Sequence, residues 1–215
     1  MPSTIVHVAV AGLIGAALLG EAFDRRALLV LAVVVAIPDL DSFIALVSTA
    51  GHRTSLHNLS IPVLAGLLWW IDVHVREESL LRSRWGAWGV RVAWVAICCY
   101  GLGHVLLDLT DGVANLFWPL HDQFYTLRGE MELSNQRGLV QTFRDGGDGF
   151  FLLDTVGSST ETEITTGVDP GTAPDGEIAE RMFPLFGSGL ELLVALTGAV
   201  ITAARFRLSH ELPDE

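Results

Sequence analysis

The chain has 215 residues, half of them hydrophobic, and its mean hydropathy is +0.45. Its formal net charge is −12, and all thirteen basic residues are Arg. This acidity argues against nucleic acid as the main partner, because phosphate backbones are bound by basic surfaces. Apolar runs close to the roughly 20 residues needed to cross a bilayer predict an integral membrane protein. An acidic excess without Lys is typical of proteins adapted to high salt, so we expect a halophilic source.

Five apolar segments predict a bundle of membrane helices. They cover about residues 4–20, 27–47, 59–73, 86–109 and 183–205. Pro38 disfavours helix at the residue before it, so the second segment should break or kink at its PDLD sequence. Trp69 and Trp70 suit a membrane interface. The predicted fold class is therefore all-α, a polytopic membrane bundle of about five transmembrane helices.

The composition changes after the fourth apolar segment. Residues 121–180 contain twelve acidic residues and three Arg, and they are rich in Gly, Ser and Thr. This composition predicts a long extramembrane loop. The expected organisation is a membrane-embedded core at 1–120, an acidic loop region at 121–182, and the last helix with its tail at 183–215. Cys98 and Cys99 would diverge on a helix, so we expect small core residues rather than a disulfide.

The arginines predict the orientation, since positive loops stay on the cytoplasmic side. Seven of them follow the first, third and fifth apolar segments: Arg25, Arg26, Arg76, Arg82, Arg84, Arg205 and Arg207. Five spans put all seven on one side, and they put Arg53 and the acidic loop on the other. This topology predicts an external N-terminus and an external acidic loop.

The same topology brings potential metal ligands from four stretches to one depth near the outer face. They are His7, Asp39, Asp41, His52, His57, His104 and Asp108. His104 and Asp108 lie one helical turn apart on the same face. Imidazole nitrogens and carboxylate oxygens suit zinc, and also iron or manganese, and two such ions can activate water and clamp a phosphoryl group. Arg53 offers a fork for phosphate oxygens.

Each of these residues also has an ordinary structural explanation. His7 could be a packed histidine, the PDLD carboxylates could cap a turn, and Arg53 could pair with a headgroup or an Asp. His121 and Asp111 are weaker candidates, and Asp111 could simply make the turn after the fourth segment. Because ionisable groups are costly in a membrane, their convergence favours a metal site over separate structural roles.

A family resemblance rests on four sequence elements in order. They are an early His, PDLD, GHRTSLHN and GHVLLDLTDGVANLFWPL. Together they resemble the YdjM-like family of membrane-bound, metal-dependent hydrolases of bacteria and archaea, over about residues 1–120. The resemblance implies distant kinship with helical zinc-dependent phospholipases C, and hence phosphoester hydrolysis. Leu56 and Asn58 stand where the family often has Thr and Ser, and residues after about 120 match no named family.

The resemblance assigns metal binding or catalysis to the matching positions: His7, Asp39, Asp41, His52, Arg53, His57, His104 and Asp108. We expect one or two divalent ions, with zinc first, to activate a water that attacks a phosphoester, including one in a lipid. Asp41 or Asp108 would take the proton and Arg53 would steady the phosphate. Membrane lipids and a phosphoester substrate are the expected partners, and no nucleic acid is expected.

Two other functions are compatible with the same residues. A non-catalytic membrane protein could use the metal only to fix its fold, with no open coordination position. An ion or proton transporter would use intramembrane Asp and His residues, spread across the whole depth of the membrane. The ionisable residues here cluster at one end, and the sequence has no inverted repeat. The substrate, the metal and the oligomeric state stay open.

Overall fold

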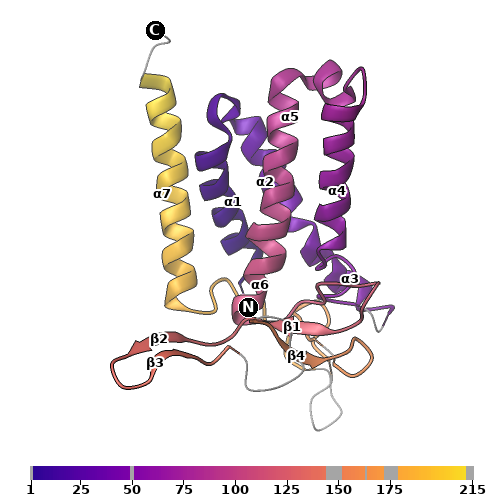
Figure 1. Cartoon of the computed structure of the whole chain (residues 1–215), viewed down its shortest axis with the longest axis vertical. Coiled ribbons are helices and arrows are strands. Elements are labelled where there is room, and N and C mark those ends of the chain that lie inside the picture. The colour runs from indigo at the N-terminus through magenta and orange to yellow at the C-terminus, as the bar shows by residue number, and fades with distance from the viewer. Residues whose placement is uncertain (1, 49–50, 144–151, 163, 172–178, 212–215) are drawn as a thin grey trace. The chain divides into compact units, whose positions relative to one another are not determined.

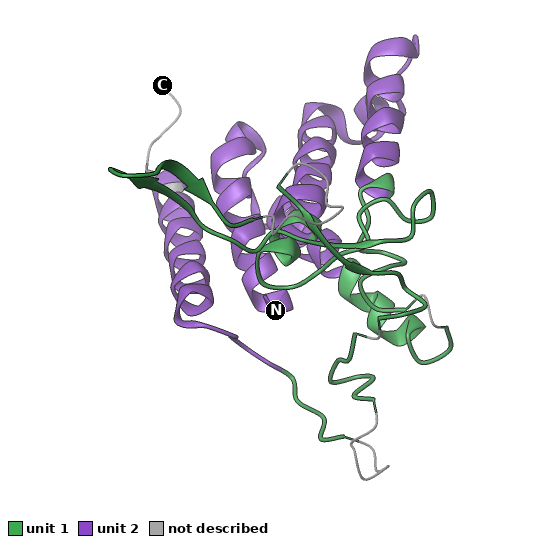
Figure 2. Cartoon of the chain, turned by 60° about the horizontal axis from the view of Figure 1, so that its bottom comes forward, with its two compact units in different colours: residues 1, 38–60, 105–183 green, residues 2–37, 61–104, 184–215 purple. Residues whose placement is uncertain are grey.

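The computed structural model describes residues 2–48, 51–143, 152–162, 164–171 and 179–211. The chain divides into two compact units, each assembled from separate segments (Figure 2). Unit 1 contains residues 38–60 and 105–183 together with residue 1, and unit 2 contains residues 2–37, 61–104 and 184–215. The chain passes from unit 2 to unit 1 at Pro38, the predicted break, and again directly after His104.

Unit 2 is built from the apolar helices, coloured from indigo to yellow along the chain in Figure 1. They are α1 (Thr4–Leu18), α2 (Arg25–Ala36), α4 (Ser60–Trp70), α5 (Leu80–Tyr100) and α7 (Gly189–Glu211), with α4 entering the unit at residue 61. Short turns η1 (Gly20–Ala22) and η3 (Ile71–Val75) follow α1 and α4. Helix α1 packs against both α2 and α7, and α2 packs against α5. Each of the five predicted apolar segments therefore contains one of these helices, although the last helix begins at Gly189 rather than at residue 183.

Small residues allow α1 and α7 to approach closely. A Cβ on Gly198 would lie 2.6 Å from the carbonyl oxygen of Ala9, and one on Gly12 would lie 2.7 Å from the hydroxyl of Thr202. Gly198 meets main-chain atoms, so glycine is required there for this packing, whereas at Gly12 the close atom belongs to a side chain that could rotate. Membrane helices use this device because close backbone contact replaces the hydrophobic driving force available in water.

Three helical stretches are long and apolar enough to cross a membrane: Arg25–Ile44, Leu80–Asp111 and Gly189–Ser209. The stretches Thr4–Leu18 and Ser60–Val75 are apolar but shorter. The five-span topology therefore stays a prediction, whereas a mostly helical membrane protein is confirmed. Cys98 and Cys99 are both free thiols, as their adjacency on a helix predicts.

The predicted break at PDLD is confirmed. Helix α2 ends at Ala36, and the chain continues through the 3₁₀ turn η2 (Pro38–Leu40) into the short helix α3 (Asp41–Ile44). Proline supplies no N–H and restricts the residue before it, which ends the regular helix. The Ser42 hydroxyl donates to the Asp39 carbonyl oxygen at 2.7 Å and closes the turn. This turn places the carboxylates of Asp39 and Asp41 within unit 1.

Unit 1 corrects the all-α prediction, because it contains two small antiparallel sheets. Strand β1 (Phe124–Thr126) pairs with β4 (Asp154–Gly157), and β2 (Met131–Ser134) pairs with β3 (Gly138–Gln141). Helix α6 (Leu106–Asp111) and the π turn η4 (Gly101–Val105) continue α5. Strands of three or four residues are too short to show a recognisable alternation of apolar and polar residues, so the acidic region reads as a loop.

Asp24 links the start of α2 to α5. One carboxylate oxygen accepts the Ala27 N–H at 2.6 Å as the helix N-cap, and the other accepts the Trp88 indole N–H at 3.0 Å. We expect Asp24→Ala to lower the free energy of unfolding by about 1–2 kcal/mol, since both donors lose their acceptor. Thermal unfolding in detergent measures this change. Asp24→Ser keeps a cap but not the indole acceptor and should lie between, whereas equal stability of all three proteins would contradict the assignment.

Candidate metal centre

Asp41 is the centre of a buried polar group in unit 1. It opens α3 and is 0% exposed. Its two carboxylate oxygens accept from Nδ1 of His52 and from Nδ1 of His57, each at 2.8 Å, and the second oxygen also accepts the Leu56 N–H at 3.3 Å. A carboxylate can only accept, so both imidazoles carry their proton on Nδ1. The Nε2 atoms of both rings therefore point away from Asp41 and take no part in these two hydrogen bonds.

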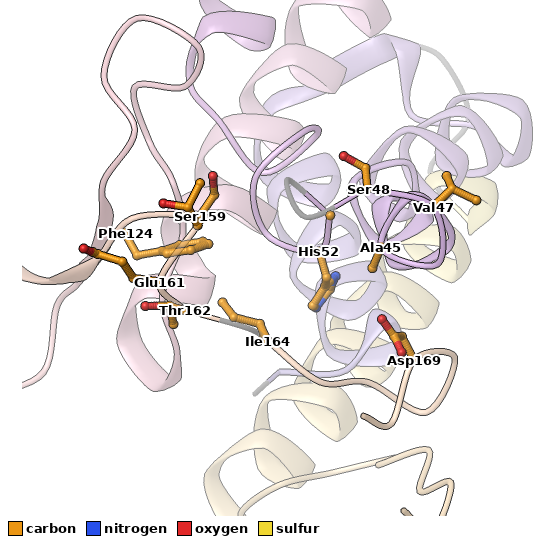
Figure 3. Close-up of a pocket in the computed structure, with 12 residues that line it drawn as sticks. Ala45, Val47, Ser48, His52, Phe124, Ser159, Glu161, Thr162, Ile164 and Asp169 are labelled. Carbon is orange, nitrogen blue, oxygen red and sulfur yellow. The ribbon is translucent and has the colours of Figure 1, made fainter. Parts of the chain in front are cut away.

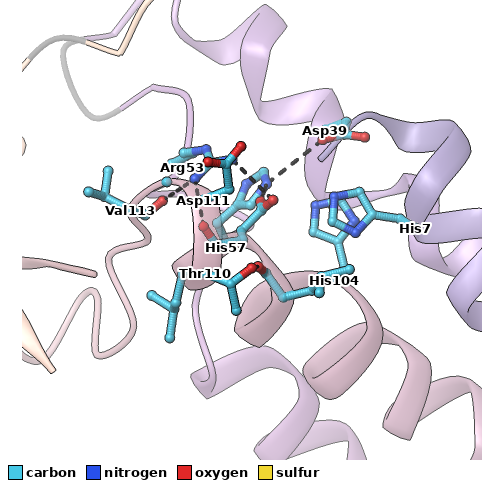
Figure 4. Close-up of polar contacts among 12 residues, drawn as sticks. His7, Asp39, Arg53, His57, His104, Thr110, Asp111 and Val113 are labelled. Carbon is cyan, nitrogen blue, oxygen red and sulfur yellow. Dashed lines mark hydrogen bonds and ion pairs between the residues drawn. The ribbon is translucent and has the colours of Figure 1, made fainter. Parts of the chain in front are cut away.

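Two further carboxylates of unit 1 lie at Nε2 of His57. This atom is 3.1 Å from Oδ2 of Asp108 and 3.8 Å from Oδ1 of Asp39 (Figure 4). The side chain of Asp108 is 1% exposed and that of Asp39 is 30% exposed. His57 therefore meets carboxylates from the PDLD turn and from α6, which are far apart in the sequence.

Arg53 holds Asp108 from the other side. Its Nη2 lies 3.0 Å from Oδ1 of Asp108, and its Nη1 donates to the carbonyl oxygens of Val113 at 2.6 Å and Asp108 at 3.3 Å (Figure 4). The side chain is 1% exposed, and its backbone has φ +63°. A Cβ on Gly112 would overlap the guanidinium, so glycine makes room for it. These contacts favour a positioning role for Arg53 on Asp108, in place of the predicted direct contact with a phosphate.

The cluster carries more negative than positive charge. The carboxylates of Asp39, Asp41 and Asp108 meet the single guanidinium of Arg53, which leaves two negative charges before His57 is considered. Buried charge is costly unless it is paired or coordinates a metal. A divalent cation matches this excess, and the donor set of imidazole and carboxylate suits zinc, iron or manganese.

The pKa values of the two imidazoles that are hydrogen-bonded to Asp41 shift in opposite directions. Burial lowers the pKa of His52, and its hydrogen bond to Asp41 offsets this only in part. Burial also opposes protonation of His57, but hydrogen bonds to Asp108 and Asp41 outweigh it and raise the pKa of His57 to about 9. A proton on Nε2 of His57 therefore occupies the position that a cation would take. Asp41, His52 and His57 form one of the described groups of potential ligands, with one atom from each within 4.8 Å of the others, but the Nδ1 atoms and the Asp41 oxygens are already hydrogen-bonded to one another.

The loop that carries these histidines is fixed by its own polar contacts. The Asn58 side-chain amide donates to the carbonyl oxygens of Thr54 and Ser55 at 3.2 and 2.9 Å. The main chain of Arg53 accepts from the N–H of Asn115 at 2.9 Å. Asn58, which departs from the usual family pattern, thus has a structural task. Asn115 is 0% exposed and was missed by the sequence analysis, since an Asn after a helix carries no distinctive signal.

Unit 2 holds a second pair of predicted ligands. The rings of His7 and His104 stack with centroids 3.8 Å apart and an interplanar angle of 20° (Figure 4). Nδ1 of His7 donates to the Gly103 carbonyl oxygen at 3.0 Å, and Nδ1 of His104 donates to that of Val35 at 2.7 Å. Carbonyl oxygens only accept, so the proton again sits on Nδ1. Metal-binding histidines are typically oriented in this way. That both pairs of histidines bind the same one or two ions stays a prediction of the sequence.

His121 and Asp111, the two weaker candidates for metal ligands, make other contacts. The main-chain carbonyl of Asp111 accepts from Nη2 of Arg128 at 2.6 Å, and the ring of His121 lies 6.3 Å from that of Tyr125. Neither belongs to the groups of potential ligands found among the described residues. The turn at Asp111 that the sequence predicts is where α6 ends.

Comparison with known proteins identifies the family. The family model described as "YdjM inner membrane protein" matches residues 1–142. The chain belongs to the YdjM family. No curated protein and no solved structure matches it. Membership, together with the long apolar helices, makes this YdjM protein an integral protein of the plasma membrane. The match covers all the predicted ligands, and it extends past the apolar core into β1, β2 and β3 of unit 1.

The Arg53→Lys substitution tests whether Arg53 positions Asp108 or contacts a phosphate directly in this YdjM protein. An ammonium cannot reproduce the forked contacts to Asp108 and Val113, so Asp108 should lose its fixed position. We expect metal affinity to fall about 10–100-fold, as for other groups that orient ligands. Chelator competition measures it, with Arg137→Lys in the exposed β2–β3 turn as the matched control. Unchanged metal affinity with a raised KM would instead support direct phosphate contact.

The raised pKa of His57 predicts opposite pH trends for stability and metal binding. In the metal-free protein, its ion pairs stabilise the fold fully below pH 6.5, and this contribution is lost as the pH rises through about 9. A metal on Nε2 must displace a proton, so apparent affinity should rise up to about tenfold per pH unit in the same window. Thermal unfolding and chelator competition at several pH values measure both trends. A metal affinity that does not change with pH would contradict the prediction.

Proposed function

We propose that this YdjM protein is a membrane-bound, metal-dependent hydrolase that acts on a phosphoester. The observation that carries the proposal is the Asp41 carboxylate holding two imidazoles by Nδ1 inside a buried cluster of excess negative charge. Oriented imidazoles with a carboxylate behind them are characteristic of metal sites, since the partner fixes the ring and raises its basicity. A packed core would gain nothing from three carboxylates around one histidine.

The residues present fit a divalent cation. Nε2 of His52 is buried and makes no hydrogen bond within the described part of the chain. His57 directs Nε2 toward the carboxylates of Asp39 and Asp108. Nε2 of His57 and the carboxylates of Asp39 and Asp108 would hold the ion, and His52, His7 and His104 are assigned as further ligands by the sequence alone. When bound, a divalent ion of this kind makes water more acidic and polarises a phosphoryl oxygen. Zinc is the first expectation, with manganese and iron as alternatives.

The chain's own side chains divide the remaining tasks. Both Asp41 oxygens already accept from imidazole N–H groups, so Asp41 orients the ligands rather than moving a proton. Asp39 is the most exposed carboxylate of the cluster, and it is the better acceptor for the proton of an attacking water. Arg53 keeps Asp108 in place and balances part of its charge.

A structural metal site is the second candidate, and burial favours it. Asp41 and His57 are both 0% exposed, and closed coordination is typical of structural sites. The partial exposure of Asp39 and the cavity beside His52 support the catalytic alternative, since they leave access to the cluster. The proposal also includes the five-span topology with the site near the outer face, where a lipid phosphoester would be within reach.

Metal content and hydrolysis measured together test the proposal. We expect about one or two equivalents of zinc or manganese in detergent-purified protein, and hydrolysis of a chromogenic phosphodiester or a short-chain phospholipid. His57→Ala should lose the metal and the activity. Asp39→Asn should lose activity by about 100-fold or more, with at least part of the metal retained.

The control is His74→Ala, because His74 is exposed and its contacts in the described structure are with two neighbouring tryptophans. Its ring meets Trp69 edge-on and stacks on Trp70, and its Nδ1 donates to the Trp70 carbonyl oxygen at 3.3 Å. It should keep both metal and activity. Bound metal with no hydrolysis in any protein would support the structural alternative. Full activity in Asp39→Asn would remove Asp39 from the mechanism, and no metal even after reconstitution would refute the proposal.

A further inference from the structure

Unit 1 contains a cavity of about 580 Å³, and His52 of the Asp41 cluster lines it (Figure 3). One wall is formed by Ala45, Val47, Ser48, Gly51 and His52, and the other by Ser159, Thr160, Glu161, Thr162, Ile164 and Asp169. Its volume lies in the range of small-molecule sites, roughly 300–1,000 Å³. The described polar residues on its walls are Ser48, His52, Ser159, Thr160, Glu161, Thr162 and Asp169.

His52 connects the cavity to the cluster. Its side chain is 4% exposed, its Nδ1 is held by Asp41, and it lines the cavity. Nε2 has no hydrogen-bond partner in the described part of the chain. A buried ring nitrogen without a partner is costly unless a ligand or ion completes it. The cavity is therefore equipped to receive a ligand next to the cluster.

The wall opposite His52 is held in place before any ligand arrives. The Asp122 carboxylate accepts the Ser159 N–H at 3.1 Å and the Ser159 hydroxyl at 2.8 Å. It also accepts the Asn115 amide at 2.5 Å. Hydrogen bonds to the carboxylate lower the pKa of Asp122 despite partial burial, so it stays ionised at neutral pH. Preformed walls reduce the entropy that a ligand must overcome.

The charges on the walls select against anions. Among the described lining residues there is no Arg, whereas two are acidic. Oε2 of Glu161 already accepts the N–H and the hydroxyl of Ser158, at 3.2 and 3.0 Å, which weakens its pull on a cation. The four lining hydroxyls outnumber the two carboxylates and are spread over a volume much larger than a single ammonium group needs. Ser159 donates its hydroxyl hydrogen to Asp122, but its oxygen can still accept from a ligand hydroxyl. Many dispersed hydroxyls and carboxylates match the hydroxyls of a polyol.

We propose that this cavity binds an uncharged, polyhydroxylated group, such as a sugar or a cyclitol. The side chains of Thr162 and Asp169 contribute hydrogen bonds to its hydroxyls, and Phe124 and Ile164 cover its apolar edges. That this group is the headgroup of the substrate rests on the proposed hydrolase function. The binding itself does not require that function.

Direct binding to the full-length, metal-free protein tests the proposal. The protein is kept in lauryldimethylamine oxide with a chelator, because a detergent with a sugar headgroup would compete. Saturation-transfer NMR then gives Kd for myo-inositol, methyl glucoside and methyl galactoside, with ethanolamine as the cationic probe. We expect at least one polyol to bind about tenfold or more tighter than ethanolamine. Tighter binding of dioctanoylphosphatidylinositol than of inositol would identify a lipid as the source, and equal binding a free polyol.

Two substitutions separate a polyol site from an ammonium site. Thr162→Val keeps the shape of the side chain but removes its hydroxyl, so it should weaken polyol binding about tenfold. Asp169→Asn keeps the hydrogen-bonding capacity of the side chain, so polyol affinity should change less than about threefold. Thr165→Val is the matched control, since Thr165 is exposed and does not line the cavity. If ethanolamine binds more tightly than the polyols and this binding is lost in Asp169→Asn, the proposal is wrong. It is also wrong if no polyol binds, or if Thr162→Val and Thr165→Val lose the same polyol affinity.

The result is separable from that of the proposed function. Polyol binding by a protein that holds no metal would keep the cavity and refute the hydrolase. Metal-dependent hydrolysis without polyol binding would support the proposed hydrolase and refute the polyol site.

Discussion

The two imidazoles that share the carboxylate of Asp41 impose the main constraint on unit 1. A carboxylate taken out of water needs donors on both oxygens, and His52 and His57 supply them at 2.8 Å each. Meeting this need requires the PDLD turn and the histidine loop to lie together. The break at Pro38 makes the PDLD turn, and the Asn58 contacts hold the histidine loop, so both features support this contact; Nε2 of each ring then faces away from Asp41.

The same arrangement recurs in unit 2 with different acceptors. His7 and His104 donate from Nδ1 to main-chain carbonyls, so their tautomer is set by the helices rather than by a carboxylate. Four histidines in two units thus have the same nitrogen engaged. A histidine that serves only packing has no need of a fixed tautomer, whereas a ligand does, because the lone pair must sit on the other nitrogen. This repetition is the strongest structural support for a metal centre in this YdjM protein.

Arg53 shows how a correct residue can acquire a different role. The sequence marks it as exceptional, since an Arg between two loop histidines is unusual, and a phosphate fork is the natural hypothesis. In the structure, the guanidinium is buried against Asp108 and Val113, and Gly112 leaves space for it. Sequence spacing alone does not reveal that Asp108 needs a counter-charge at this point. The expectation that the family resemblance ends near residue 120 was wrong, since the family match continues to residue 142. The cavity residues Ser159, Thr162 and Asp169 lie beyond that match, and the sequence did not single them out.

The sequence by itself determined the membrane location, the five apolar helices, the break at Pro38 and the residues with metal-binding chemistry. Hydropathy runs, proline stereochemistry and ligand type are local properties, so they can be read one segment at a time. Only the tertiary structure decided that Asp41 orients two histidines, that Arg53 supports Asp108, and that β1 pairs with β4. These outcomes depend on which distant segments meet and on where buried charge finds a partner, and neither is encoded within a single stretch of the chain.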